Sequence, residues 1–218
     1  MKKAIFIFIF IVFISFFTFS QNNHNKFSLS GNISGLVIPK AKVDDLNIDL
    51  RGESQFGFHA SMNCYYNFFK NFNLGTGFGY QKRNYFYSVY LINEKLFDHK
   101  ITYSYLAVPL SINYNRPFSN EKLSSFFEVG FTRNFFIGYS SRSNPVGKGD
   151  QFVVNYAYKS FNEVNLNIGI LYKFLDNWSI PFSFLVSYNN YSTIATTPES
   201  DLYSKPFIFG IKTGLKFN

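Results

Sequence analysis

Apolar side chains occupy every second position over long stretches of this chain. The segment 55–68 shows the pattern most clearly: its even positions, from Phe56 to Phe68, are apolar, and most of its odd positions are polar or small. Successive side chains of a β-strand point to opposite faces, whereas a helix would place apolar residues three and four positions apart. The pattern therefore predicts strands with one apolar face and one polar face.

This alternation recurs in eight segments: 27–37, 55–68, 73–83, 105–114, 127–137, 163–172, 178–188 and 207–217. In a bilayer every backbone N–H and C=O group needs a partner within the protein, so a sheet can span only when it closes on itself. Its outer face must then be apolar, while its inner face can be polar. We therefore expect an all-β fold, an eight-stranded antiparallel up-and-down transmembrane β-barrel.

Two details refine the assignment of faces. Gly75, Gly77 and Gly79 fall on the expected inner face, where small residues make room for larger side chains across a narrow lumen. Arg133 falls on the apolar face of its segment. We expect it near the membrane interface, where its aliphatic stem can reach toward water.

The connections between the segments alternate in length. Those at 70–71, 117–122 and 175–177 are short, whereas those at 39–53, 91–100, 141–160 and 190–205 are long. In outer-membrane barrels the short turns face the periplasm and the long loops face the exterior. We therefore expect both termini in the periplasm and four exposed loops.

The N-terminus has the features of a secretory signal. Lys2 and Lys3 precede an apolar run over 4–17, and small residues lead up to Ser20. An uncleaved anchor helix is the alternative, although the run is shorter than the roughly 20 residues that span a bilayer. We expect cleavage after Ser20, a signal peptide over 1–20, one barrel domain over 21–218 and a place in the outer membrane of a Gram-negative bacterium.

The charge and the reactive residues narrow the chemistry. The formal net charge is +8, or +6 without the two lysines of the signal, which suits contact with outer-membrane lipid and lipopolysaccharide. The chain has no dense block of lysine and arginine of the kind that would indicate nucleic-acid binding.

Cys64 is the only cysteine, so no disulfide forms within the chain. His24, His59 and His99 are scattered, so we expect no metal and no cofactor.

Three segments resemble a known family. The sequence YLAVPLSINY at 105–114, followed by NLNIGILYKF at 165–174 and FGIKTGLKF at 209–217, resembles the PorT-like outer-membrane β-barrel family of Bacteroidota. The resemblance implies an outer-membrane barrel whose terminal strand is read by the barrel assembly machinery. That family includes a component associated with protein secretion and gliding. The chain departs from the family at Ala107, where relatives often have an inward acid, and in ending at Asn218 rather than an aromatic residue.

Five charged residues fall on the inner face of the expected barrel: Arg83, Glu128, Glu163, Lys212 and Lys216. The interior of an eight-stranded barrel is just wide enough for side chains to fill. Because single buried charges are costly, we expect these residues to pair with one another or with trapped water as a polar plug. A narrow channel is the alternative.

One pair could be catalytic. His59 and Ser61 share a strand face, and their spacing resembles the His-x-Ser of barrel enzymes that deacylate lipid A. Such a site needs an acid to orient the histidine and access for acyl chains. The pair faces the lumen together with Asn63 and Asn67, so we expect polar filling of the lumen and no catalysis.

Aromatic residues crowd the expected outer rim: Tyr85, Phe86, Tyr87, Tyr90, Tyr156, Tyr158, Phe161, Tyr188 and Tyr191. They suit either an interfacial girdle or an adhesive surface. We therefore expect a monomeric barrel with a structural or surface-interaction role, with a mobile basic loop at 141–149. The exposed loops are expected to bind a surface partner, so that deleting 143–149 should weaken this binding. An accessory subunit of a secretion or gliding machinery, a narrow channel and a lipid A-modifying enzyme are the alternatives.

Overall fold

The computed structural model describes residues 27–39, 42–44, 49–91, 94–119, 122–145, 155–156, 160–189, 193–196, 201–203 and 207–218. The expected signal peptide and its cleavage site lie outside these residues. In the part of the chain that is described, no helix is long and apolar enough to cross a membrane.

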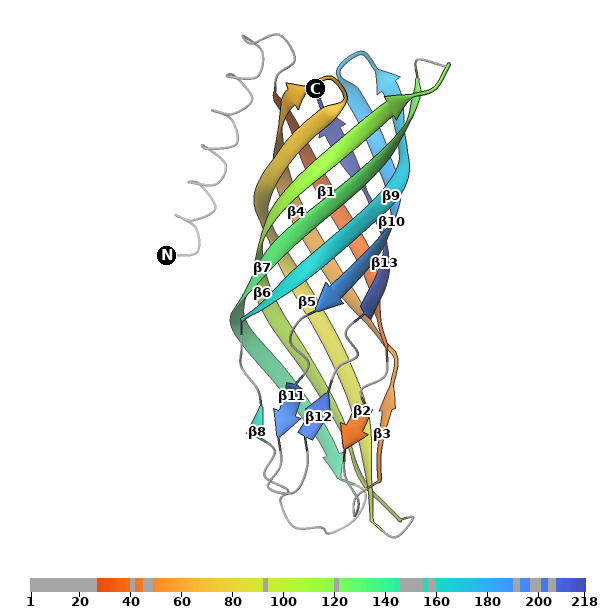
Figure 1. The fold of residues 1–218 in the computed structure, drawn as a ribbon. Coiled ribbons are helices and arrows are strands. Elements are labelled where there is room, and N and C mark those ends of the chain that lie inside the picture. Colours follow the sequence, from red (N-terminus) through yellow and green to blue (C-terminus); the bar gives the residue numbers. More distant parts are fainter. Residues whose placement is uncertain are drawn as a thin grey trace.

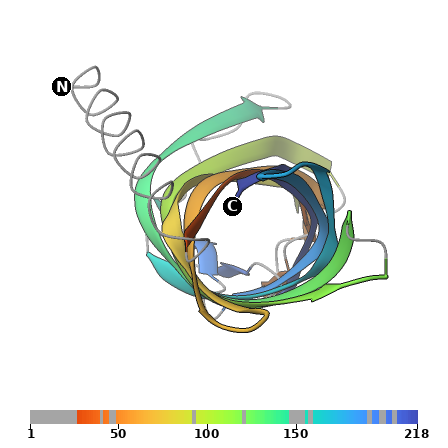
Figure 2. The same cartoon turned by 90° about the horizontal axis from the view of Figure 1, so that it is seen from above.

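Eight long strands form a closed barrel, as the alternation predicts (Figures 1 and 2). They are β1 (Phe27–Ile38), β4 (Gln55–Phe69), β5 (Phe72–Leu91), β6 (Glu94–Pro117), β7 (Leu123–Pro145), β9 (Phe161–Leu175), β10 (Trp178–Asn189) and β13 (Phe207–Phe217). Each pairs antiparallel with the next along the chain, and β13 pairs with β1 to close the cylinder. The fold prediction is confirmed.

The register fixes the stagger of the barrel. Following paired residues once around it leads from Phe72 on β5 through Tyr114, Phe127, Ile168, Phe184, Ile211, Gly35 and Phe58 back to β5 at Lys82. The path returns 82 − 72 = 10 residues beyond its start, which is the shear of the barrel. With about 3.3 Å per residue and about 4.8 Å between strands, this shear tilts the strands by about 40°.

The two faces of the strands match the predicted alternation. Outward residues such as Phe56, Ile168 and Phe184 are 76%, 54% and 65% exposed, so a broad apolar surface surrounds the barrel. Inward residues are buried although most are polar; on β1 they are Ser28, Ser30, Asn32 and Ser34. An apolar exterior around a polar interior is the arrangement of a membrane barrel.

The short connections also match the prediction. Lys70 and Asn71 form the turn between β4 and β5, and Asn71 has φ 70°, a left-handed conformation that asparagine tolerates better than most residues. β6 ends and β7 begins at this same end of the barrel, where 176–177 also joins β9 to β10, close to the C-terminus (Figure 1). We call this the short-turn end and the opposite one the long-loop end.

The expected long loops contain strands, so their boundaries were wrong. β5 continues to Leu91 and β6 begins at Glu94, which leaves only 92–93 between them instead of the loop expected over 91–100. β7 likewise continues to Pro145, into the expected loop 141–160. These strands project past the ends of β10 and β13 (Figure 1), and β3 (Asp49–Glu53) extends their sheet by pairing with β5.

Four short strands form a second sheet at the long-loop end. β2 (Lys42–Asp44), β12 (Asp201–Tyr203), β11 (Thr193–Thr196) and β8 (Asn155–Tyr156) pair in that order. They come from three of the connections that were expected to be loops. The alternation did not predict them because strands of two to four residues are too short to show a period.

Candidate functional site

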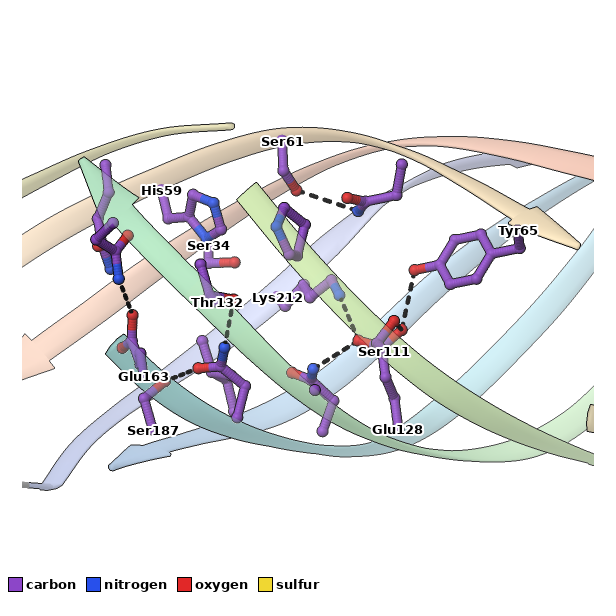
Figure 3. Close-up of a pocket in the computed structure, with 18 residues that line it drawn as sticks. Ser34, His59, Ser61, Tyr65, Ser111, Glu128, Thr132, Glu163, Ser187 and Lys212 are labelled. Carbon is purple, nitrogen blue, oxygen red and sulfur yellow. Dashed lines mark hydrogen bonds and ion pairs between the residues drawn. The ribbon is translucent and has the colours of Figure 1, made fainter. Parts of the chain in front are cut away.

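The lumen holds a polar network centred on Glu128 of β7. Its carboxylate accepts hydrogen bonds from Lys212 Nζ at 3.0 Å, Tyr65 OH at 2.9 Å and Asn167 Nδ2 at 2.7 Å. Figure 3 shows Tyr65 and Lys212 both reaching Glu128; they come from β4 and β13, which are separated only by β1 and lie across the lumen from β7. The donors come from β13, β4 and β9, so this one carboxylate ties together strands that lie far apart around the barrel.

A second ion pair lies nearer the long-loop end. Arg83 Nη2 on β5 is 2.9 Å from Glu163 Oε1 on β9, and Asn134 Nδ2 donates to Glu163 Oε2 at 2.9 Å. Arg83 and Glu163 are 2% and 3% exposed. A buried charge costs several kcal/mol unless it is paired and hydrogen-bonded, and this arrangement meets both conditions.

Lys216 is the fifth inward charge, and it has a different neighbour. Its Nζ lies 5.3 Å from the centre of the Tyr65 ring, on the side of the network toward the short-turn end. A lysine over an aromatic face is attracted by the ring quadrupole. Four of the five predicted charges thus form two ion pairs, and Lys216 stacks on the tyrosine that bonds Glu128.

An aromatic cluster lies on the inner face beyond Arg83, toward the long-loop end. The Phe161 ring stacks on the Arg83 guanidinium at 4.3 Å and meets Tyr105 edge-on at 5.0 Å. Tyr103 packs against Tyr85 and Phe136, with ring centres 5.9 and 6.3 Å apart. We call these five rings and Arg83 the aromatic plug; four of the rings are buried, Phe136 is half-buried, and they come from the adjacent strands β5, β6, β7 and β9.

The aromatic plug corrects the expectation of an exposed aromatic rim. Tyr85, Tyr87 and Phe161 are 6%, 3% and 4% exposed, and they point into the barrel rather than to its surface. Of the other rim residues whose side chains are described, Tyr188 is 46% exposed, whereas Phe86 and Tyr90 are half-buried. The side chains of Tyr156, Tyr158 and Tyr191 lie outside the described part of the structure.

Two small cavities lie in the lumen. One of about 50 Å³ is lined by Glu128, Lys212 and Glu163 and by His59 and Gln81, and one of about 20 Å³ lies between Tyr65 and Lys216. A water needs roughly 10–15 Å³ measured this way, so the cavities suit a few single waters and no organic ligand. Such waters would bond the buried atoms His59 Nε2 and Gln81 Oε1, which lack a protein partner.

His59 and Ser61 line the larger cavity, but no hydrogen bond joins them. The Ser61 hydroxyl accepts a hydrogen bond from Asn63 at 3.3 Å, and His59 Nε2 has no partner. The nearest carboxylates are already engaged, Glu163 by Arg83 and Glu128 by Lys212. The acid–base–nucleophile arrangement that a hydrolase needs is therefore not assembled here (Figure 3).

Inward glycines make the room that the large side chains of the network occupy. A Cβ added at Gly75 would lie 2.6 Å from Tyr65 Cε1, and one added at Gly79 would lie 2.6 Å from His59 Nε2. Both glycines belong to β5, next to the strand that carries Tyr65 and His59. The absence of a side chain there lets Tyr65 extend across the lumen to Glu128.

Arg133 lies on the outer face, as predicted. Its Nη1 donates to Asn162 Oδ1 at 2.8 Å, and its guanidinium lies 5.7 Å from the centre of the Phe135 ring.

Among the described residues, no group of three histidine, cysteine, aspartate or glutamate side chains could hold a metal ion.

Comparisons with known proteins identify the fold class. No protein-family model and no curated protein matches the chain. The crystal structure of the outer membrane protein OprG from Pseudomonas aeruginosa is similar with a TM-score of 0.52 and 16% identity, over 88% of this chain and 95% of OprG. Neisserial surface protein A covers 88% of this chain and 97% of its own, with 9% identity and a TM-score of 0.49. The likeness shows a shared fold, the eight-stranded outer-membrane β-barrel.

Proposed function

We propose that this protein is an outer-membrane barrel with a structural or surface-interaction role and no catalytic activity. The observation that carries the proposal is the occupied lumen: two buried ion pairs and the aromatic plug lie in the interior, and the cavities among the described residues suit only single waters. A barrel with such an interior offers other molecules its outer face and its long-loop end, not a pore or a reaction chamber.

The projecting strands support an interaction role. β5, β6 and β7 extend beyond the apolar surface, and the outward residues of β6 change there from Leu106 to Ser104, Thr102 and Lys100. A polar sheet that continues out of the membrane suits contact with a surface partner. In this proposal the long-loop end faces the exterior and the short turns face the periplasm.

The orientation is tested by labelling intact cells with a membrane-impermeant maleimide. In a Cys64→Ser background, Ser141→Cys near the long-loop end should react in intact cells. Lys70→Cys in a short turn should react only after the outer membrane is permeabilised. Both native side chains are exposed in the structure, so accessibility does not distinguish them. The opposite pattern would contradict the orientation.

The interaction role is tested by a loop deletion. The structure narrows the segment expected at 143–149, because β7 pairs with β6 as far as Pro145. Deleting 146–150 alone keeps these pairs, so the barrel should assemble while binding to a surface partner weakens. Unchanged binding to every candidate partner would contradict the loop hypothesis.

We also propose membership of the PorT-like family, supported by the strand motif at 105–114. In the structure this motif forms the middle of β6, where Leu106, Val108 and Leu110 face outward and Ala107 faces the lumen. Purification of the protein from detergent extracts with a secretion subunit would support the accessory role that this family suggests.

A further inference from the structure

Four basic side chains gather on one sector of the outer face at the long-loop end. They are Lys82 on β5, Lys100 on β6, and Arg133 and Arg142 on β7, and we call them the basic sector. Among the side chains that are described at this end, the outward positions of β1, β4, β9, β10 and β13 carry no lysine or arginine. In the described part of the long-loop end, the outward cations therefore lie on three adjacent strands.

Lys82 and Arg133 form the lower tier of the basic sector. Lys82 pairs with Ser104 and Arg133 with Val108, four residues away along β6. Because the strands are tilted, a residue paired across one strand boundary from β5 toward β7 lies about one and a quarter residues nearer the long-loop end than its partner. The two boundaries between Lys82 and Arg133 offset most of the four residues along β6, so the two cations differ in height by only about 4 Å. They lie about 16 Å apart over the surface.

Lys82 lies at the edge of the apolar surface, and Arg133 lies just inside it, because Phe135 and Ile137 continue the apolar face of β7 toward the long-loop end. Lys82 Nζ is 5.8 Å from the centre of the Tyr80 ring, and Arg133 contacts Phe135. Tyr80 and Phe135 are 38% and 45% exposed, so each cation adjoins a ring that faces lipid. Cations in this position meet the headgroup level of a bilayer.

Lys100 and Arg142 form the upper tier. They are direct partners across β6 and β7, and lie about 13 Å (Lys100) and about 16 Å (Arg142) further from the membrane centre than Lys82. Like charges directly opposite on a sheet destabilise it unless an anion compensates them. Asp98 shares this face of β6 and accepts a hydrogen bond from Ser88.

In the part of the chain that is described, no ion pair with a carboxylate of the protein neutralises the basic sector. Within the described residues, the ion pairs join Arg83 to Glu163, Lys212 to Glu128 and Lys173 to Asp176, and none includes a member of the sector. The sector therefore presents four outward cations at two heights beside an apolar surface, with no ion-pair partner among the described residues.

We propose that the basic sector binds lipopolysaccharide through its phosphate and acidic sugar groups, while the acyl chains lie against the apolar surface of β5, β6 and β7. The inference rests on the proposed place of the barrel in the outer membrane. A glycolipid is favoured over a soluble polyanion because the cations continue directly from lipid-facing rings. The lower tier contacts the phosphorylated sugars next to the acyl chains, and the upper tier contacts acidic sugars further out.

The test is lipopolysaccharide binding by the full-length protein in neutral detergent, read as the rise in barrel unfolding temperature during a titration. Wild type should show a saturable rise. A variant with glutamine at Lys82, Lys100, Arg133 and Arg142 should bind at least tenfold more weakly. The matched control replaces Lys70, Arg116, Lys122 and Lys173 with glutamine, which removes four exposed cations from the short-turn end. It should bind as wild type does.

Three results would overturn the inference. Equal losses in both variants would show that net charge alone attracts the lipid. Undiminished binding of dephosphorylated lipopolysaccharide would remove the role of the phosphates. Equally tight binding of inorganic polyphosphate, which has no acyl chains, would make the sector a site for soluble polyanions. The unfolding transition measured without lipid shows whether each variant forms the barrel. A failure of the proposed barrel is therefore distinguished from a failure to bind lipopolysaccharide.

Discussion

Lys212 and Glu128 meet inside the barrel with Nζ and Oε1 3.0 Å apart, although 84 positions separate them in the chain. Their side chains are 13% and 6% exposed, so the ion pair is largely shielded from solvent. Because Tyr65 and Asn167 also donate to Glu128, the carboxylate would keep two neutral partners if the lysine were removed.

Removing one member of this pair should be more harmful than removing both. Lys212→Met leaves a buried carboxylate without its cation, and we expect a loss of about 3–5 kcal/mol in the free energy of unfolding. Combining it with Glu128→Gln should recover much of that loss. The measurement is urea unfolding in lipid vesicles. Equal or additive losses would show that the pair does not act as a unit.

A small residue should be important for barrel stability only where a large side chain packs directly over it in the lumen. Gly75→Ala brings a methyl group against the Tyr65 ring, so it should destabilise the barrel by about 1–3 kcal/mol. Gly35→Ala is the matched control, because its Cβ meets nothing within 4 Å on the outer face. The same unfolding assay compares them, and equal effects of the two variants would contradict this account of the interior.

The occupied lumen should not conduct ions. In planar bilayers, we expect no discrete conductance steps from wild type. A triple variant, Arg83→Ala with Glu163→Ala and Phe161→Ala, removes the ion pair nearer the long-loop end and the ring stacked on Arg83. This variant should show discrete conductance steps if it still assembles. Steps from wild type would favour the narrow channel instead.

The His59 and Ser61 pair should have no part in lipid chemistry. Neither residue is hydrogen-bonded to the other, so Ser61→Ala should leave the lipid A acyl pattern of the outer membrane unchanged. Mass spectrometry of extracted lipid A from cells with the wild-type protein, the variant and no protein makes the comparison. A pattern that changes with Ser61→Ala would restore the enzymatic hypothesis.

The faces of the strands could be predicted from the sequence because a period of two depends only on neighbouring residues. Even the outward position of Arg133 followed from it. The position of Tyr85 could have been predicted in the same way, since it shares the inward parity of Arg83 and Gln81. Reading Tyr85 as a rim residue placed the end of the strand too early.

The partners across the lumen could not be predicted in this way. That Arg83 meets Glu163, rather than Glu128, depends on the shear and on the order of closed strands, which no local pattern encodes. The short strands β2, β8, β11 and β12 were missed for a related reason, because their pairing is set by tertiary contacts.

The central claim is a closed barrel in the outer membrane, and one measurement tests it most directly. The purified outer-membrane fraction is run on a detergent gel with and without boiling, since a closed barrel keeps its fold in detergent until it is heated. The account predicts recovery in this fraction and a band that shifts on boiling. Recovery from the soluble periplasm, or a band that does not shift, would contradict it.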